Sequence, residues 1–316
     1  MAVDRVSFEL AAGESLGLIG ESGSGKSTLG YALVNLLPPP GHITGGRILL
    51  DGDRDLVALA PKDWPGVWGT EVGMVFQGAQ SMFNPLMTID QQFRDIFKAH
   101  HIDVAAGMAD AERLLRQTRL DARRVLGLYP HEMSGGMRQR VAIVAAVMLH
   151  PRLLILDEPT TALDVVSQAQ VLRILREIRE EHGLSMIFIT HDFAVASNIG
   201  DRVAVMYAAQ IVEIGPSRTL YRTSRHPYTR GLVGAVPSLA SGERELVGIP
   251  GQPPDMRDPP SGCRFADRCG FVEDACRQRE PARERVSAQE PHFVSCRRWQ
   301  EIAGANVTEE VTGYAH

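Results

Sequence analysis

A glycine-rich segment with one lysine directly follows a short apolar run, and this combination is typical of a loop that cradles a polyphosphate. Residues 20–28 read GESGSGKST and match the pattern G-x-x-x-x-G-K-[ST], after the apolar residues 16–19. Glycine adopts backbone angles closed to other residues, so successive N–H groups can turn inward around phosphates. The alternative is a Gly/Ser turn with a chance lysine. The pattern favours a nucleoside triphosphate site formed by Gly20, Glu21, Ser22, Gly23, Ser24, Gly25, Lys26, Ser27 and Thr28.

Two side chains of this loop and two later acids have distinct expected roles. Lys26 is expected to reach the β- and γ-phosphates, and Ser27 to place its hydroxyl on Mg²⁺. Asp157 and Glu158 follow the apolar residues 153–156, which would anchor them at a strand end. In a phosphate-loop enzyme Asp157 would hold the Mg²⁺ shell and Glu158 would polarise the attacking water. The alternative is that both acids only cap the next helix.

Two single polar residues also end apolar runs. Gln77 closes residues 72–76, and His191 follows residues 188–190. We expect Gln77 to contact the metal or water, and His191 to hydrogen-bond the γ-phosphate or the attacking water. A plain strand-ending polar residue and a structural histidine are the alternatives.

A serine and two glycines open a long helical stretch and form a second candidate anion site. Ser134 is expected to cap this helix while the amides of Gly135 and Gly136 face an anion. The phosphate loop of the same chain already occupies one face of the nucleotide. A composite site made by two chains is therefore predicted.

The elements that must position these residues alternate between strands and helices. Apolar residues between 171 and 178 recur at helical spacing with charged residues between them, so this helix is expected to bury one face. Residues 78–150 are expected to be mostly helical. The predicted fold is α/β with a largely parallel sheet, and the phosphate loop at the carboxyl end of a strand. Strands are predicted at residues 15–19, 47–50, 72–76, 153–156, 185–189 and 203–206.

Composition excludes several classes of protein. The 316 residues are 44% hydrophobic and 22% charged, which is ordinary for a globular chain, and a net charge of -5 disfavours nonspecific nucleic-acid binding. The longest apolar run, residues 141–149, is too short to cross a bilayer. No export signal is recognised at the N-terminus, so a cytosolic location is expected.

Together, these ordered motifs resemble those of the ABC transporter ATPase family over residues 1–235. The resemblance implies a P-loop NTPase (ABC ATPase) core that hydrolyses ATP with Mg²⁺, and a helical subdomain at about 78–150 that docks on a membrane subunit. It also implies a dimer in which the signature loop of one chain closes on ATP held by the other. By this resemblance Lys26 and Ser27 belong to Walker A, Gln77 to the Q-loop, Ser134–Met137 to the signature, Asp157 and Glu158 to Walker B, Asp164 to the D-loop and His191 to the switch.

Two departures from the family pattern stand out. Met133 and Met137 flank the signature glycines where LSGGQ is usual, while Ser134 and both glycines are kept. Methionine at the second flank is familiar from the peptide-importer branch. The family stacks adenine on an aromatic residue that precedes the strand equivalent to residues 6–10. Either the chain is expected to begin too late to include that residue, or adenine is held weakly, so no residue is assigned to adenine stacking.

The C-terminal third resembles the oligopeptide/dipeptide importer ATPases. The motifs at residues 160–170, HPYT at 226–229 and GCRFADRC at 262–269 carry this resemblance. It implies a small cysteine-containing C-terminal domain over residues 236–316, peptide uptake and a peripheral position on the cytoplasmic face of the membrane. The implied partners are two integral membrane permease subunits, a second ATPase subunit, identical or homologous, and indirectly an extracytoplasmic solute-binding protein. No nucleic-acid partner is expected.

Four cysteines lie within the last 54 residues and are separated by five, six and nineteen residues. Four thiolates suffice for a [4Fe–4S] cluster. Zinc and metal-free thiols are the alternatives, although the paired C-x₂₋₄-C spacing of tetrathiolate zinc sites is missing. The predicted cluster ligands are Cys263, Cys269, Cys276 and Cys296.

Two other functions are alternatives to transport. ABC-type ATPase cores also serve in DNA repair and translation, where an inserted cysteine module binds zinc. The net negative charge of the chain argues against a function in DNA repair or translation. A nonhydrolytic scaffold is countered by Glu158 and His191. The transported solute is not determined by this chain, and a dipeptide or oligopeptide is the preferred hypothesis.

Overall fold

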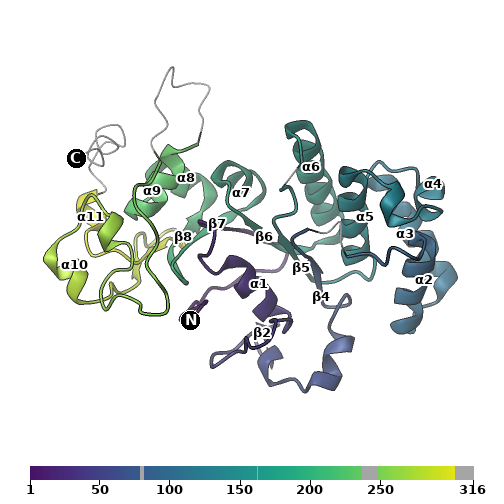
Figure 1. Ribbon diagram of the computed structural model, residues 1–316, viewed down its shortest axis with the longest axis horizontal. Helices are drawn as coiled ribbons and strands as arrows, with labels where there is room; N and C mark the ends of the chain where they lie inside the picture. Colours follow the sequence, from purple (N-terminus) through teal and green to yellow (C-terminus); the bar gives the residue numbers. More distant parts are fainter. Residues whose placement is uncertain (79–81, 162, 237–247, 303–316) are drawn as a thin grey trace. The chain divides into compact units, whose positions relative to one another are not determined.

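The computed structural model describes residues 1–78, 82–161, 163–236 and 248–302 of the chain (Figure 1). These residues fold as two units. The first contains Met1–Glu9, Ser15–Leu29 and the chain from Thr190 onward. The second contains Leu10–Glu14 and Gly30–Ile189.

In the first unit, the central strand pairing is parallel, as the sequence predicts. β1 (Ser15–Ile19) pairs in parallel with β7 (Arg202–Tyr207), and every residue of β1 is buried. β7 then pairs antiparallel with β8 (Gln210–Pro216). β10 (Phe293–Val294) adds to β8, and β9 (Glu284–Arg285) adds to β10, both antiparallel. The sheet of this unit thus includes strands from both ends of the chain.

Short helices complete the first unit. α7 (Phe193–Ile199) packs so closely on β1 that a Cβ atom at Gly17 would lie 2.9 Å from the Cβ atom of Ala196. The remaining helices are α8 (Ser217–Thr223), α9 (Pro227–Gly234), α10 (Asp274–Gln278) and α11 (Trp299–Ile302), with a 3₁₀ turn at Ala266–Arg268.

Three aromatic side chains form the centre of this unit's core. The ring of Tyr207 lies 4.6 Å from that of Tyr228 and 5.2 Å, edge to face, from that of Phe265. All three are fully buried. Because Phe265 lies between Cys263 and Cys269, the cysteine-bearing segment contributes directly to this core.

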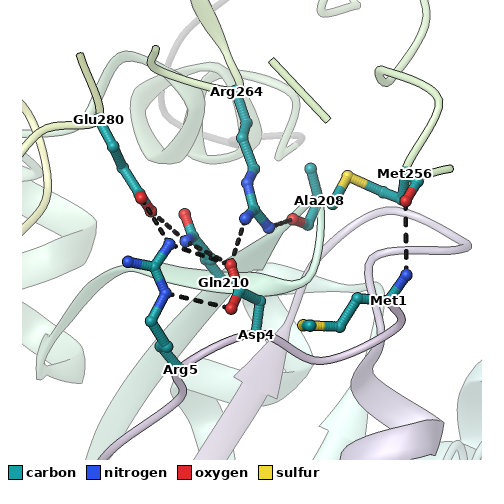
Figure 2. Close-up of polar contacts among 8 residues, drawn as sticks. All are labelled: Met1, Asp4, Arg5, Ala208, Gln210, Met256, Arg264 and Glu280. Atoms are coloured by element: carbon teal, nitrogen blue, oxygen red, sulfur yellow. Dashed lines mark hydrogen bonds and ion pairs between the residues drawn. The ribbon is translucent and has the colours of Figure 1, made fainter. Parts of the chain in front are cut away.

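Polar contacts join the same segment to the N-terminal residues (Figure 2). Arg264 forms an ion pair with Asp4 and donates to the carbonyl oxygen of Ala208 at 2.6 Å. Arg5 pairs with Glu280 at 2.5 Å. The pKa of Asp4 is lowered by its hydrogen bonds with Arg5 and Arg264, which outweigh the opposing effect of burial. The N-terminal and C-terminal segments are therefore held together by charge-assisted bonds.

The second unit contains the other parallel strands. β4 (Val72–Val75) pairs with β5 (Leu153–Asp157), and β5 with β6 (Ser185–Thr190), all in parallel. The strand predicted at residues 47–50 is only the two-residue β2 (Leu49–Leu50), paired antiparallel with β3 (Arg54–Asp55). Two 3₁₀ turns, Leu56–Ala58 and Pro61–Gly66, follow it.

Helices occupy most of the described part of residues 78–150, as predicted. α2 (Ile89–Ala99), α3 (Val104–Gln117), α4 (Ala122–Leu126) and α5 (Gly135–Val147) lie together, with a 3₁₀ turn at Pro130–Glu132 (Figure 1). α6 (Val165–His182) buries the predicted apolar face. In the described residues, no helix is both long and apolar enough to span a membrane.

Candidate active site

The phosphate loop follows β1 and leads into α1 (Lys26–Leu33), the strand–loop–helix order that the motif requires. Two of its glycines are sterically obligatory. Gly20 has a φ of 157°, and a Cβ atom there would lie 2.1 Å from the carbonyl oxygen of Met206. At Gly25, with φ 103°, a Cβ atom would lie 2.2 Å from the carbonyl oxygen of Ala2. Only glycine fits this path of the backbone.

Lys26 lies inside the loop rather than in solvent. Its Nζ donates to the carbonyl oxygens of Gly20 at 2.8 Å and Glu21 at 2.9 Å. The residue is only 5% exposed. An ammonium group with three donors, held by loop carbonyls, concentrates positive charge where the sequence predicts phosphate.

The structure brings Gln77 and Glu158 together in the second unit. Gln77 follows β4, Glu158 follows the adjacent strand β5, and Gln77 Nε2 donates to Glu158 Oε2 at 3.3 Å. Thr161 Oγ1 donates to the same oxygen at 2.9 Å. Thr161 was not among the residues predicted for this site, and its position three residues after Glu158 was the available signal. Two donors on one oxygen fix the orientation of the carboxylate.

The backbone of Glu158 has an unusual conformation. Its φ is 48°, a left-handed value that is uncommon for a residue other than glycine, and its N–H donates to the carbonyl oxygen of Ile189 at 3.0 Å. Such conformations concentrate at functional sites. Asp157, the last residue of β5, is fully buried, so the two neighbouring acids occupy different environments.

The predicted second anion site lies at the start of α5. Ser134 caps this helix, accepting from the N–H of Met137 at 3.3 Å. Its own hydroxyl hydrogen remains available to donate. A Cβ atom at Gly136 would have no neighbour within 4 Å, so this side of the helix start is open. The flanking Met133 is buried, at 3% exposure, and packs as a core residue.

Asp164 caps the next long helix, α6. Its carboxylate accepts from the N–H of Ser167 at 2.9 Å and from the Ser167 hydroxyl at 2.7 Å. These hydrogen bonds lower the pKa of Asp164. The first two residues of the helix, Val165 and Val166, are 83% and 79% exposed. Two apolar side chains thus stand in solvent beside Asp164.

Two known protein-family models match separate segments of the chain. Residues 3–161 match the model described as ABC transporter, and residues 212–276 match that described as oligopeptide/dipeptide transporter, C-terminal region. The chain is 44% identical to the oligopeptide transport ATP-binding protein OppD of Bacillus subtilis, over 93% of this chain and 82% of that protein. The chain belongs to the ABC transporter ATP-binding protein family, in its oligopeptide/dipeptide branch.

A second relative and a solved structure agree with this assignment. The dipeptide transport ATP-binding protein DppD of Caldanaerobacter subterraneus is 38% identical over 95% of this chain and 92% of that protein. The ATP-binding cassette MJ0796, in a dimeric post-hydrolysis state bound to ADP and Pi, matches with a TM-score of 0.61 and 26% identity. That match covers 69% of this chain and 91% of the other. The ABC ATPase fold predicted from the motifs is confirmed.

The predicted site residues of this ABC protein divide between its two units. Residues 20–28 and His191 belong to the first unit, and His191 is exposed directly after β6. Gln77, Ser134, Gly135, Gly136, Asp157, Glu158 and Asp164 belong to the second unit. Within the second unit, a hydrogen bond joins Gln77 and Glu158, two predicted residues from separate motifs.

The four cysteines of the ABC protein line a single cavity in the first unit. Its volume is about 20 Å³, and its other lining residues include Phe265, Phe271 and Val272. Burial raises the pKa of Cys263, that of Cys269 to about 11 and that of Cys296 to about 12, and neighbouring thiols add to the effect. In the described part of the chain, no group of three or more His, Cys, Asp or Glu side chains is arranged to hold a metal ion. The predicted cluster is thus not seen as a formed metal site.

Proposed function

We propose that this chain is the ATP-hydrolysing subunit of an ABC importer that takes up dipeptides or oligopeptides. The observation that carries the proposal is one chain that holds a buried phosphate-loop lysine and an oriented Glu158, and that is similar over most of its length to peptide transport ATP-binding proteins. The named relatives are transport proteins, so DNA repair or translation is not adopted as the function.

Each site residue has a role in this proposal. The amides of residues 20–25 bind the phosphates and Lys26 neutralises their charge. Ser27, Gln77 and Asp157 would hold Mg²⁺, which supplies charge stabilisation on the phosphate oxygens. Glu158 accepts a proton from the attacking water, and His191 hydrogen-bonds the γ-phosphate or that water. The two donors on Glu158 Oε2 hold the carboxylate in one orientation for this role.

A second ATPase chain, identical or homologous, completes the site in this proposal. Ser134, Gly135 and Gly136 would bind the ATP held by the phosphate loop of the partner chain. Asp164 would lie at the same interface between the two chains. The open side of Gly136 and the exposed Val165 and Val166 support a surface that another chain covers. Closure of the pair on ATP and reopening after hydrolysis would drive the importer.

The remaining architecture is also proposed. Residues 1–235 would form the ATPase domain, with the helical subdomain at about 78–150 docking on two permease subunits at the cytoplasmic face of the membrane. Residues 236–316 would form the C-terminal domain. A solute-binding protein would select the peptide outside the cell.

A detergent co-purification tests this function. The chain, expressed with the genes encoded beside it, should extract with two integral membrane proteins and show ATP hydrolysis that a dipeptide-loaded binding protein stimulates. Recovery with ribosomes or nucleic acid instead, and no membrane partner, would contradict the transport function.

We also propose that Cys263, Cys269, Cys276 and Cys296 bind a [4Fe–4S] cluster. All four thiols line one cavity, and four thiolates are the donor set of such a cluster, although the described residues do not form a metal site as they stand. The raised pKa values of Cys263, Cys269 and Cys296 keep these three thiols protonated near neutral pH, so iron binding to them would release protons. The cluster would tie together a segment with little core of its own. A cavity of about 20 Å³ is too small for a four-iron cluster, so its lining side chains would rearrange on binding.

Metal analysis of anaerobically purified protein tests the cluster. We expect iron and acid-labile sulfide in equal amounts, and loss of both in Cys296→Ser. The adjacent Ser295→Ala is the matched control and should keep both. Protein with neither iron nor sulfide after anaerobic reconstitution would contradict the assignment, and stoichiometric zinc would replace it with the zinc alternative.

A further inference from the structure

The second residue of the phosphate loop is held by a side chain from the cysteine-bearing segment. Arg268 donates from Nη1 to Glu21 Oε2 at 2.8 Å and from Nη2 to Glu21 Oε1 at 2.9 Å. The Arg268 side chain is only 4% exposed, and that of Glu21 is 29% exposed. A two-point bond of this kind between a guanidinium and a carboxylate fixes direction as well as distance.

Arg268 is itself immobilised from several sides. Its Nε donates to the carbonyl oxygen of Pro250 at 2.7 Å, and Nη2 also donates to that of Ile249 at 3.2 Å. The guanidinium carbon lies 5.6 Å from the ring centre of Tyr207 and 5.8 Å from that of Phe265. The Arg268 side chain is therefore already ordered, so its bond to Glu21 costs little further conformational entropy.

The charge of Arg268 is secure in this setting. Burial lowers its pKa, but hydrogen bonds to Glu21 and Tyr207 outweigh burial and raise the pKa above its ordinary value. The guanidinium therefore stays positive at any physiological pH.

The backbone of Glu21 is fixed as well. Its N–H donates to the hydroxyl oxygen of Tyr228 at 2.8 Å, and Tyr228 is fully buried at the start of α9. The carbonyl oxygens of Gly20 and Glu21 are the two that hold Lys26 Nζ. A continuous set of contacts thus runs from Arg268 through Glu21 to Lys26.

The ion pair with Arg268 also changes the net charge of the phosphate loop. Glu21 is an acid within a loop that is proposed to bind a triphosphate, and a bare carboxylate there would repel the ligand. Arg268 neutralises that carboxylate at contact distance. Without Arg268, the loop would lose both its anchor and this compensation.

We propose that Arg268 is a positioning residue for ATP: it fixes the phosphate loop through Glu21 and cancels the charge of Glu21, so the cysteine-bearing segment takes part in nucleotide binding. This inference rests on the proposed function, because it requires that residues 20–28 bind ATP. It adds to that function a residue that lies 247 positions away from its loop partner.

A double-mutant cycle on the full chain tests the proposal, with the Kd for ATP measured by calorimetry and folding by thermal unfolding. Arg268→Gln should raise the Kd about tenfold, because the Glu21 carboxylate beside the phosphates then loses its cationic partner. Arg268→Lys keeps the positive charge but cannot make the two-point hydrogen bond of the guanidinium, and should raise the Kd by a smaller factor. Glu21→Gln in the Arg268→Gln background should restore part of the affinity, since the repelling carboxylate is then gone. A purely structural role predicts lower thermal stability, an unchanged Kd for the folded protein and no rescue.

The matched control is Arg283→Gln. Arg283 is another arginine of the C-terminal region, and it donates to the carbonyl oxygen of Ser7 at 2.6 Å and lies over the ring of Phe293 at 4.6 Å. Its replacement should leave the Kd unchanged. Folded Arg268 variants with wild-type Kd values, or additive losses in the double mutant, would overturn the proposal while ATP binding by the wild type stands. A wild-type chain that binds no ATP would overturn the proposed function together with this proposal.

Discussion

Replacement of Glu158 by glutamine is expected to lower the rate of ATP hydrolysis by about 10²- to 10⁴-fold, the usual contribution of a general base. Glutamine has nearly the same shape, but its amide cannot accept a proton from water. Thr161 and Gln77 orient the carboxylate through one oxygen, at 2.9 and 3.3 Å, so the lost function is proton acceptance rather than placement. Steady-state phosphate release by the purified importer measures the effect.

The same variant should still bind ATP and should still form the ATP-dependent pair of ATPase chains, because neither step needs a base. Size-exclusion chromatography with and without ATP measures this pairing. The matched control is Glu180→Gln, which changes an exposed acid on α6 and should hydrolyse ATP at the wild-type rate. Hydrolysis by Glu158→Gln near the wild-type rate would show that another group takes the proton.

Apolar runs and the glycine motif predicted the buried parallel strands and the phosphate loop correctly. The apolar runs before Gly20 and Asp157 are buried strands because uninterrupted apolar residues suit a parallel sheet. The glycine pattern predicted the phosphate loop because glycines are needed where its backbone passes the carbonyl oxygens of Met206 and Ala2. The contact between Gln77 and Glu158 follows from two adjacent parallel strands whose carboxyl ends share one edge.

β8 escaped prediction because a charged residue interrupts its apolar pattern. Glu213 lies within this strand and is 1% exposed. Its carboxylate accepts from the N–H groups of Arg225 at 2.7 Å and His226 at 3.0 Å, and lies 2.8 Å from Nε2 of His292. A buried acid is tolerated only when such partners exist, and these come from later segments.

The contact between Glu21 and Arg268 was equally hidden. The sequence placed Glu21 in the phosphate loop and Arg268 beside a cysteine, but no periodicity or spacing connects residues so far apart. The packing of Phe265 against Tyr207 and Tyr228, together with the carbonyl oxygens of Ile249 and Pro250, places Arg268 at the loop. Motifs therefore located the residues of the chemistry, while tertiary packing decides what supports them.

Replacement of Lys26 by alanine is expected to weaken ATP binding by about 10- to 100-fold, since a hydrogen bond to a charged group contributes about 1.5–3 kcal/mol. The ammonium group is buried in the loop and held by the carbonyl oxygens of Gly20 and Glu21, so its position is set before the nucleotide arrives. Calorimetric titration with ATP measures the loss. This effect falls on affinity, whereas that of Glu158→Gln falls on turnover.

Two comparisons separate a lost ligand contact from a damaged loop. Lys98→Ala removes an exposed lysine that pairs with Asp95 on α2, and should leave the Kd for ATP unchanged. Thermal unfolding of Lys26→Ala in the absence of nucleotide measures the separate contribution of its two carbonyl bonds to the folded loop. If Lys26→Ala unfolds like the wild type and binds ATP with wild-type affinity, the phosphates do not lie at Lys26, and residues 20–28 are not the triphosphate site. If it binds weakly while Glu158→Gln binds normally, nucleotide binding and water activation depend on different residues, which is the division of roles that the proposed mechanism requires.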